Sequence, residues 1–101
     1  MAKLITVFWR DIPAQVIAKR GRDSAKVQLS RRFQVAIDRA AMRVGKGSSE
    51  AYLADWRREP RQCSDDLKKE AETEAARLET GYSDEDLECL IKSGGARKYN
   101  S

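Results

Sequence analysis

The residues from Ser30 to Gly45, SRRFQVAIDRAAMRVG, constrain the fold more than any other stretch of the sequence. Apolar residues recur there at the three- and four-residue intervals of one helical face. These apolar residues are Phe33, Ala36, Ile37, Ala40, Ala41 and Val44. The hydroxyl of Ser30 can cap the start of such a helix, and Gly45 stands where a glycine often ends one. The pattern predicts an amphipathic helix that packs its apolar face on the preceding strands and exposes a basic face.

The residues before this helix are typical of β-strands. Residues 4–9, LITVFW, are β-branched and aromatic on both faces, which favours a central strand. Residues 14–19 predict a second strand, and a turn at residues 10–13, RDIP, would join the two as an antiparallel hairpin. Residues 25–29 alternate polar and apolar side chains, which predicts either a short third strand or an extended segment that leads into the central helix.

A second helix is expected after the glycine- and serine-rich loop. It would span about Glu50–Arg58 and stop before Pro60, because the residue before a proline avoids the helical region. One side of this helix would carry Tyr52, Leu53 and Trp56. Residues 59–63 are expected as an extended edge segment.

Two more helices are expected in the C-terminal half. Ser64 would cap the third helix, which carries a narrow apolar stripe and ends at Gly81. The stripe consists of Leu67, Ala71, Ala75 and Leu78. Ser83 and Asp86 have the spacing of a capping box for a fourth helix at about Asp84–Lys92. The buried side of this fourth helix would be Leu87, Leu90 and Ile91.

The order of strands followed by helices predicts an α+β fold. A small antiparallel sheet of two or three strands would be followed by three or four helices packed on one face. At 101 residues the chain has the size of one domain, which we place at residues 1–95, with residues 96–101 as a flexible polar tail. No apolar run reaches the ~18 residues of a membrane helix, and the N-terminus lacks the features of a signal peptide. A cytoplasmic location is therefore expected.

Charge is divided unevenly along the chain. Residues 1–49 hold 11 Lys/Arg and 3 Asp/Glu, a net charge of +8, whereas residues 50–101 hold 9 and 13, a net charge of −4. The basic N-terminal half favours an acidic partner, such as an acidic protein or a nucleic acid. The acidic C-terminal half would repel phosphate, which argues against a dedicated DNA-binding domain.

Few residues offer catalytic or ligating chemistry. The chain has no histidine and two cysteines, so it lacks the commonest general base and any zinc-ligand set. A helical hairpin hinged at Gly81 would hold Cys63 and Cys89 too far apart for a disulfide. Cys63 is the one candidate nucleophile, because Arg61 and a helix N-terminus would lower its pKa. The leading interpretation assigns no catalytic residue, cofactor or metal site.

Four charged residues form a candidate binding site. Arg10 and Asp11 lie in the predicted hairpin turn, and loops often carry functional residues. Arg31 and Arg32 begin the central helix, whose N-terminus adds a partial positive charge. The hypothesis is that Arg10, together with Arg31 or Arg32, forms a cationic contact for a partner with an acidic surface.

The stretches ITVFWRDIPAQVIAKRGRDSAKVQLSRRFQVAIDRAAMRVG and AYLADWRRE resemble the small bacterial proteins grouped as the virulence-factor domain family. The same domain occurs within the larger conserved virulence factor C proteins. The resemblance covers about residues 4–79, and its most distinctive pieces are Trp9–Pro13, Val27–Phe33 and Trp56-Arg57. It implies a bacterial, intracellular accessory domain, and it brings no catalytic motif.

These observations leave three hypotheses for the function. The leading one is a non-enzymatic cytoplasmic domain that binds another protein through an acidic surface of that protein. The first alternative is a weak RNA- or DNA-binding regulator that uses the basic N-terminal half. The second alternative is a small thiol-dependent enzyme or redox protein that uses Cys63. No membrane partner is expected.

Overall fold

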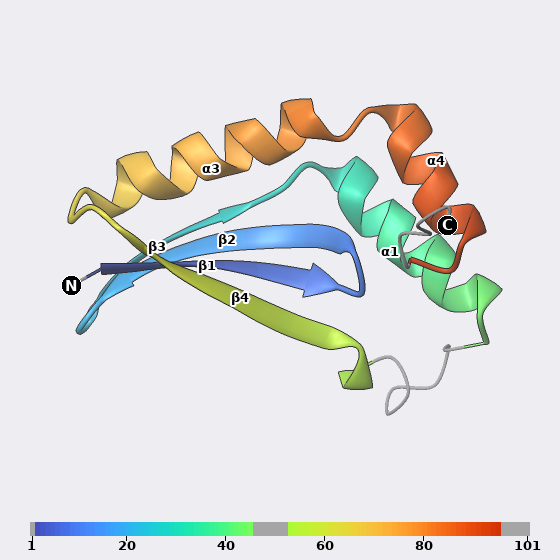
Figure 1. Cartoon of the computed structure of the whole chain (residues 1–101), viewed down its shortest axis with the longest axis horizontal. Helices are drawn as coiled ribbons and strands as arrows, with labels where there is room; N and C mark the ends of the chain where they lie inside the picture. The colour runs from blue at the N-terminus through green and yellow to red at the C-terminus, as the bar shows by residue number, and fades with distance from the viewer. Residues whose placement is uncertain (1, 46–52, 96–101) are drawn as a thin grey trace, which may run out of the picture.

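The computed structural model describes residues 2–45 and 53–95, which form one antiparallel sheet and the helices around it (Figure 1). The elements in chain order are β1 (Ala2–Trp9), β2 (Ile12–Arg20), β3 (Asp23–Gln28), α1 (Arg31–Arg43), β4 (Trp56–Cys63), α3 (Leu67–Gly81) and α4 (Asp84–Lys92). The strand order in the sheet is β3-β2-β1-β4. The α+β class is confirmed, with one strand more than the sequence predicts. The predicted tail, residues 96–101, lies outside the described residues.

The helices occupy one face and one end of the sheet. Helix α3 lies along one face, over β2 and β3, whereas α1 and α4 pack side by side beyond one end of the strands (Figure 1). The helices bury most of the apolar residues predicted for them, although Leu67 is only partly buried. The buried apolar residues are Phe33, Ala36, Ile37, Ala40, Ala41, Ala71, Ala75, Leu78, Leu87, Leu90 and Ile91. Val44 departs from the prediction, because 39% of its surface is exposed.

Strand β1 is central, as its two apolar faces predict, because it pairs with β2 on one side and β4 on the other. The turn between β1 and β2 is shorter than predicted and consists of Arg10 and Asp11. Arg10 has φ +54, in the region that glycine usually occupies. Such a conformation costs about 1–3 kcal/mol, so contacts elsewhere must hold it in place.

A β-bulge interrupts the β1–β2 pairing near the turn. Val7 pairs with Gln15, but the next residue, Phe8, pairs with Pro13, which leaves Ala14 as the extra residue in β2. A bulge disrupts the ladder locally, so Pro13 is tolerated there without an N–H to donate. The sequence indicates a turn at Pro13 because proline is usual in turns, but here it lies within the strand.

The helix predicted at Glu50–Arg58 is wrong over its last three residues, because Trp56–Arg58 begin strand β4. Residues 50–52 lie outside the described residues, and Leu53, expected on the packed side, is exposed. These residues are extended because they pair with β1, and this pairing satisfies the backbone N–H and C=O groups of β1. A prediction from the local spacing of apolar residues does not include such distant pairing. The extended edge segment predicted at 59–63 is confirmed as the remainder of β4.

Two of the predicted helix caps are also wrong. Ser30 occupies the N-cap position of α1, but its hydroxyl donates to the Glu79 carboxylate at 2.9 Å and makes no cap hydrogen bond. Helix α3 is capped by Asp66, which accepts from the backbone N–H of Lys69, so Ser64 lies outside the helix. In both cases an acidic side chain provides the negative group that a helix N-terminus favours.

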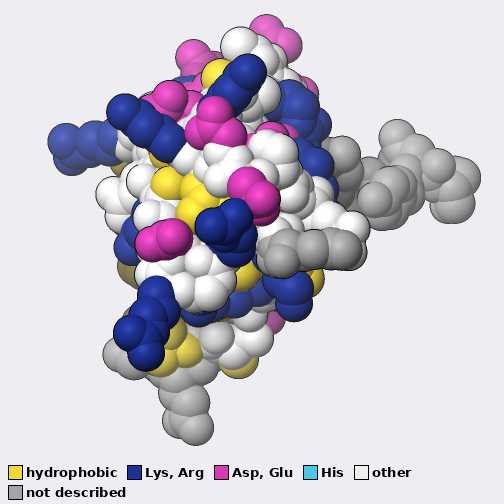
Figure 2. All heavy atoms as spheres, turned by 90° about the vertical axis from the view of Figure 1, so that its left-hand side faces the viewer, with side chains coloured by type: hydrophobic (Ala, Val, Ile, Leu, Met, Phe, Trp, Pro, Cys, Tyr) yellow, Lys and Arg dark blue, Asp and Glu magenta, His cyan; other side chains and the backbone are white. Residues whose placement is uncertain are grey.

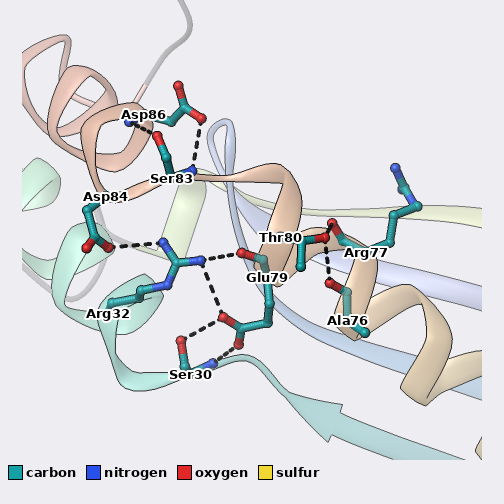
Figure 3. A network of polar contacts seen from close by, with 9 residues as sticks. All are labelled: Ser30, Arg32, Ala76, Arg77, Glu79, Thr80, Ser83, Asp84 and Asp86. Atoms are coloured by element: carbon teal, nitrogen blue, oxygen red, sulfur yellow. Dashed lines mark hydrogen bonds and ion pairs between the residues drawn. The ribbon is translucent and has the colours of Figure 1, made fainter.

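The capping box predicted for α4 is confirmed. The Ser83 hydroxyl accepts from the Asp86 N–H at 3.0 Å, and the Asp86 carboxylate accepts from the Ser83 N–H at 2.9 Å (Figure 3). The three acidic residues in the first turn are also favoured by the helix dipole. The start of this helix therefore follows from contacts between neighbouring residues that the sequence shows.

One buried carboxylate joins α3 to strand β4. Glu74 is 5% exposed, accepts from Arg77 Nε at 2.8 Å, and pairs with Arg61 of β4 at 3.2 Å. The hydrogen bond from Arg77 is the main cause that lowers the pKa of Glu74, against the opposing effect of burial. The ionised form is thus the one that the fold stabilises.

Replacing Glu74 by glutamine should make the free energy of unfolding less dependent on pH in the acidic range. A carboxylate whose pKa is lowered in the folded state contributes its full stabilisation at pH values above its ordinary pKa. This stabilisation is lost as the pH falls through the pKa of the folded state. We expect Glu74→Gln to be less stable than the wild type near neutral pH and to approach it below about pH 4. Urea unfolding over this pH range measures both curves. A difference that stays constant with pH would contradict the assignment.

Candidate binding face of the sheet

The two faces of the sheet have different surroundings. Because side chains alternate along a strand, the register assigns each residue to one face. Leu4, Val16 and Ala18 lie on the face that α3 covers, and all three are fully buried. The opposite face lies away from α3 and is uncovered by the described helices except toward the β1–β2 turn, where Val7 and Trp9 are buried (Figure 1). We define the basic face as Lys3, Ile5, Ile17, Lys19, Lys26, Arg58 and Pro60.

Each strand contributes one cation to the basic face: Lys3 from β1, Lys19 from β2, Lys26 from β3 and Arg58 from β4. All four side chains are exposed, and none has an ion pair within residues 2–45 and 53–95. The strand register places no carboxylate on this face. By contrast, the end of the molecule seen in Figure 2 mixes Lys and Arg with Asp and Glu. The single sign of charge is therefore a property of the basic face.

The centre of the basic face is apolar. Ile5 and Ile17 pair directly across β1 and β2, and both are only half-buried. Pro60 of β4 pairs with Ile5 on its other side and is exposed. The face thus combines a small aliphatic centre with cations around it, which suits a partner that presents apolar groups flanked by acids.

Lys3 and Lys19 are directly opposite each other in the β1–β2 ladder. Like charges in this position destabilise a sheet. We expect Lys3→Glu to convert the repulsion into an attraction and to raise the free energy of unfolding by about 0.5 kcal/mol. Urea denaturation at low ionic strength measures the change, and added salt should reduce it. Equal stability of the two proteins at low salt would contradict the expected repulsion.

The outer edge of β4 is a poor site for adding a strand. Pro60 has no N–H, so the ladder lacks a donor at that position. Most of the strand is also exposed and half of its residues are charged, as is common for edges that resist pairing. A partner is therefore better accommodated on the basic face than along this edge.

Two of the four predicted site residues lie where α4 meets the hairpin turn. Arg10 donates from Nε to the Asp55 carboxylate at 3.2 Å and from Nη1 to the Gly94 carbonyl at 2.9 Å. The backbone N–H of Asp11 donates to the Gly95 carbonyl at 2.9 Å, and the Asp11 carboxylate pairs with Arg57. These contacts hold the strained turn, so both residues have structural roles within the domain.

Arg32 connects three helices (Figure 3). Its guanidinium reaches the Asp84 carboxylate at 3.2 Å and donates to the backbone carbonyl of Glu79, so it joins the start of α1 to the end of α3 and the start of α4. It also lies over the ring of Phe33 at 4.6 Å. Arg31, the neighbouring residue, is exposed and has no ion pair in the described part of the chain.

The structure does not bring Arg10 and Arg32 together. Arg10 contacts Gly94, just after the end of α4, whereas Arg32 contacts Asp84, the first residue of that helix. The nine residues of α4 separate these contacts by about 14 Å at 1.5 Å per residue. Only Arg31 of the predicted set combines exposure with the absence of an ion pair among the described residues.

Cys63 and Cys89 are free thiols, as predicted from their separation. The lowered pKa expected for Cys63 is wrong: burial raises the pKa of its thiol, and the Glu70 carboxylate raises it further, against the opposing effect of Arg61. The helix N-terminus expected to lower the pKa is also not at Cys63, because α3 starts at Leu67. A thiolate nucleophile has no support at this position.

The cations of the basic face could have been found in part from the sequence. Lys3 and Lys19 each lie next to a core residue and therefore point to the opposite face of their strands. Lys26 alternates with two partly buried neighbours in the same way. Arg58 gave no such signal, because the sequence favours a helix at that position.

The structure thus defines a small α+β domain with an uncovered, basic sheet face. Residues 7–91 match the family model described as Virulence factor, which is most of the chain. The protein belongs to the virulence factor family, which confirms the resemblance seen in the sequence. No curated protein and no solved structure matches the chain.

Two further properties hold for the described residues, 2–45 and 53–95. No helix there has both the length and the apolar character required to cross a membrane. In the same ranges, no group of three or more His, Cys, Asp or Glu side chains is arranged to hold a metal ion.

Proposed function

We propose that this chain is a non-enzymatic accessory domain of the bacterial cytoplasm that binds another protein through the basic face. The partner would present carboxylates around a small apolar patch. The observation that carries the proposal is the set of four exposed cations, Lys3, Lys19, Lys26 and Arg58, without ion pairs among the described residues and without a carboxylate on their face. Charge complementarity of this kind steers association and selects partners.

The loss of stability that the Lys3–Lys19 repulsion causes supports a binding role for the basic face. Two lysines opposite each other reduce stability when no anion is present. An acidic partner would remove this repulsion on binding, so the same pair favours the complex over the free domain. Functional sites commonly lower the stability of the free fold in this way.

The composition of the face favours a protein over a nucleic acid. Single-stranded nucleic acids are commonly held by exposed aromatic rings on which bases stack. Trp9 is fully buried, and Phe8 lies on the opposite face of β1, with the Arg57 guanidinium 4.8 Å from the centre of its ring. Trp56, at the α1 end of the basic face, is half-buried. The centre of the face is instead formed by Ile5, Ile17 and Pro60, which can bury apolar side chains of a protein.

Affinity capture with matched variants tests the proposal. The full chain, the face variant Lys19→Glu/Lys26→Glu, and the control variant Lys68→Glu/Lys69→Glu would be used as baits in lysates of the cells that produce the protein. The two variants have the same net charge, and all four lysines are exposed. We expect the control to retain the protein captured by the wild type and the face variant to lose it. Loss of the captured protein with both variants, or with neither variant, would contradict the proposal.

The nucleic-acid alternative rests on the same four cations and gives a different result in the same assay. Nuclease treatment of the lysate should not release the captured protein. Binding of RNA or DNA would be lost after nuclease and would weaken steeply with salt, because phosphate contacts release counterions. Recovery of RNA or DNA in place of a protein would establish the alternative.

A further inference from the structure

A pocket of about 440 Å³ lies at the α1 end of the basic face. It is formed where the bulge of β2, the end of β3, the start of α1 and the first residue of β4 meet. Its lining residues are Ala14, Gln15, Gln28, Leu29, Arg31, Gln34 and Trp56. Pockets that bind small ligands have volumes of about 300–1,000 Å³, so this one is large enough for an amino-acid side chain with its peptide groups.

The polar groups of this pocket are available for a ligand. Gln15 and Gln28 pair directly across β2 and β3, and neither side chain has a hydrogen bond within the part of the chain that the structure describes. Arg31 is exposed and has no ion pair in that part. Among the described residues, the lining includes no acidic side chain. The described lining therefore offers one guanidinium and two free amide groups, and it includes no carboxylate to neutralise the guanidinium.

The bulge and the start of α1 set the position of these groups. The Ala14 carbonyl accepts from the backbone N–H of Leu29 at 3.0 Å, which ties the end of β3 to the bulge. Leu29 is 8% exposed and belongs to the hydrophobic core. Helix α1 starts two residues later, so Arg31 projects from an ordered helical turn. A site built on such elements is held more firmly than one built on a loop.

We propose that this pocket binds the side-chain carboxylate of a Glu or Asp residue in an acidic segment of the partner; the proposal rests on the function proposed above. Arg31 would form two parallel N–H···O bonds with the carboxylate, the geometry for which a guanidinium is suited. The amides of Gln15 and Gln28 would bind the peptide groups beside that residue. A carboxylate is favoured over a phosphomonoester because one guanidinium balances one carboxylate but leaves a phosphomonoester dianion partly unbalanced.

Nuclear magnetic resonance of the ¹⁵N-labelled full chain tests this inference directly. The probe is a blocked octaglutamate peptide, and a blocked octaglutamine peptide is the neutral control. We expect octaglutamate to shift the side-chain amide signals of Gln15 and Gln28 and the indole N–H signal of Trp56, along with backbone signals of Lys19 and Lys26. Octaglutamine should shift none of them, and shifts of equal size with both peptides would overturn the assignment of a carboxylate.

Two variants separate the pocket from the rest of the face. Arg31→Gln should weaken octaglutamate binding about tenfold, the loss expected for one charge-assisted contact, and should abolish the shifts of Gln15 and Gln28. Arg22→Gln has the same charge change on an exposed turn outside the pocket and should leave the pocket signals as in the wild type. Equal binding by the two variants would overturn the role of Arg31.

The pocket and the proposed function can fail separately. Shifts at Lys19 and Lys26 with unchanged signals of Gln15, Gln28 and Trp56 would overturn the pocket and leave the basic face supported. The absence of octaglutamate shifts on both would overturn the pocket and the acidic-protein proposal together. Tighter binding of a single-stranded oligouridine to the basic face would overturn both in favour of the nucleic-acid alternative.

Discussion

Ile37→Asp is expected to unfold the domain. Ile37 lies at the centre of α1, is fully buried, and packs in the core formed by the sheet and the helices. The change removes an aliphatic side chain, at a cost of about 2–5 kcal/mol, and adds the cost of burying a charge that has no partner. A domain of this size has a total stability of about 5–15 kcal/mol, so little or none would remain.

Circular dichroism and thermal unfolding measure this effect, and Val35→Asp is the matched control. Val35 lies on the same helix, but 40% of its surface is exposed, so the introduced carboxylate can stay in water. We expect the control to melt cooperatively within a few degrees of the wild type. A cooperative transition of Ile37→Asp at the wild-type temperature would show that the buried face of α1 is assigned incorrectly.

Gly95→Ala is expected to cause a large loss of stability, greater than that of Gly45→Ala. A Cβ atom at this position would lie 2.6 Å from Cζ3 of the fully buried Trp9 ring, and the backbone has φ +90. The ring cannot move easily, because Trp9 is enclosed in the core. Backbone strain of about 1–2 kcal/mol adds to the steric overlap, so we expect a total cost of about 3 kcal/mol or more.

Gly45→Ala separates the two causes. Gly45 also has a positive φ, +74, but a Cβ atom there would meet no atom within 4 Å. Gly45→Ala should therefore lower the free energy of unfolding only by the backbone strain, about 1 kcal/mol. Urea unfolding of both variants gives the comparison. Equal losses for the two would mean that contact with Trp9 does not constrain Gly95.

The sequence predicts those elements whose cause is local. The central helix and α4 follow from apolar spacing and, in α4, from a capping box, both of which the structure confirms. Strand β4 could not be predicted in the same way, because Trp56–Arg58 become extended only by pairing with the distant β1. The cap at Ser30 is wrong for a related reason, since Glu79 from another helix bonds to it.

The same difference between local and long-range causes applies to the predicted site residues. Arg10, Asp11 and Arg32 stand out in the sequence as charged residues at a turn and at a helix start, but the structure engages all three in contacts within the domain. Ion-pair partners more than forty positions away cannot be seen in a local pattern. The cations of the basic face are less conspicuous in the sequence, because their significance depends on which face of the sheet the helices leave uncovered.

The contacts of the hairpin turn with Gly94 and Gly95 have a consequence for how the chain folds as it is synthesised. The β1–β2 hairpin leaves the ribosome early, but the carbonyl groups that hold its turn come from residues 84 positions later. Closing a loop of that length lowers the conformational entropy of the chain before the contact can offset this cost. We therefore expect the nascent hairpin to wait, with Trp9 incompletely covered, until α4 has emerged. The domain would then acquire its native structure in one late cooperative step.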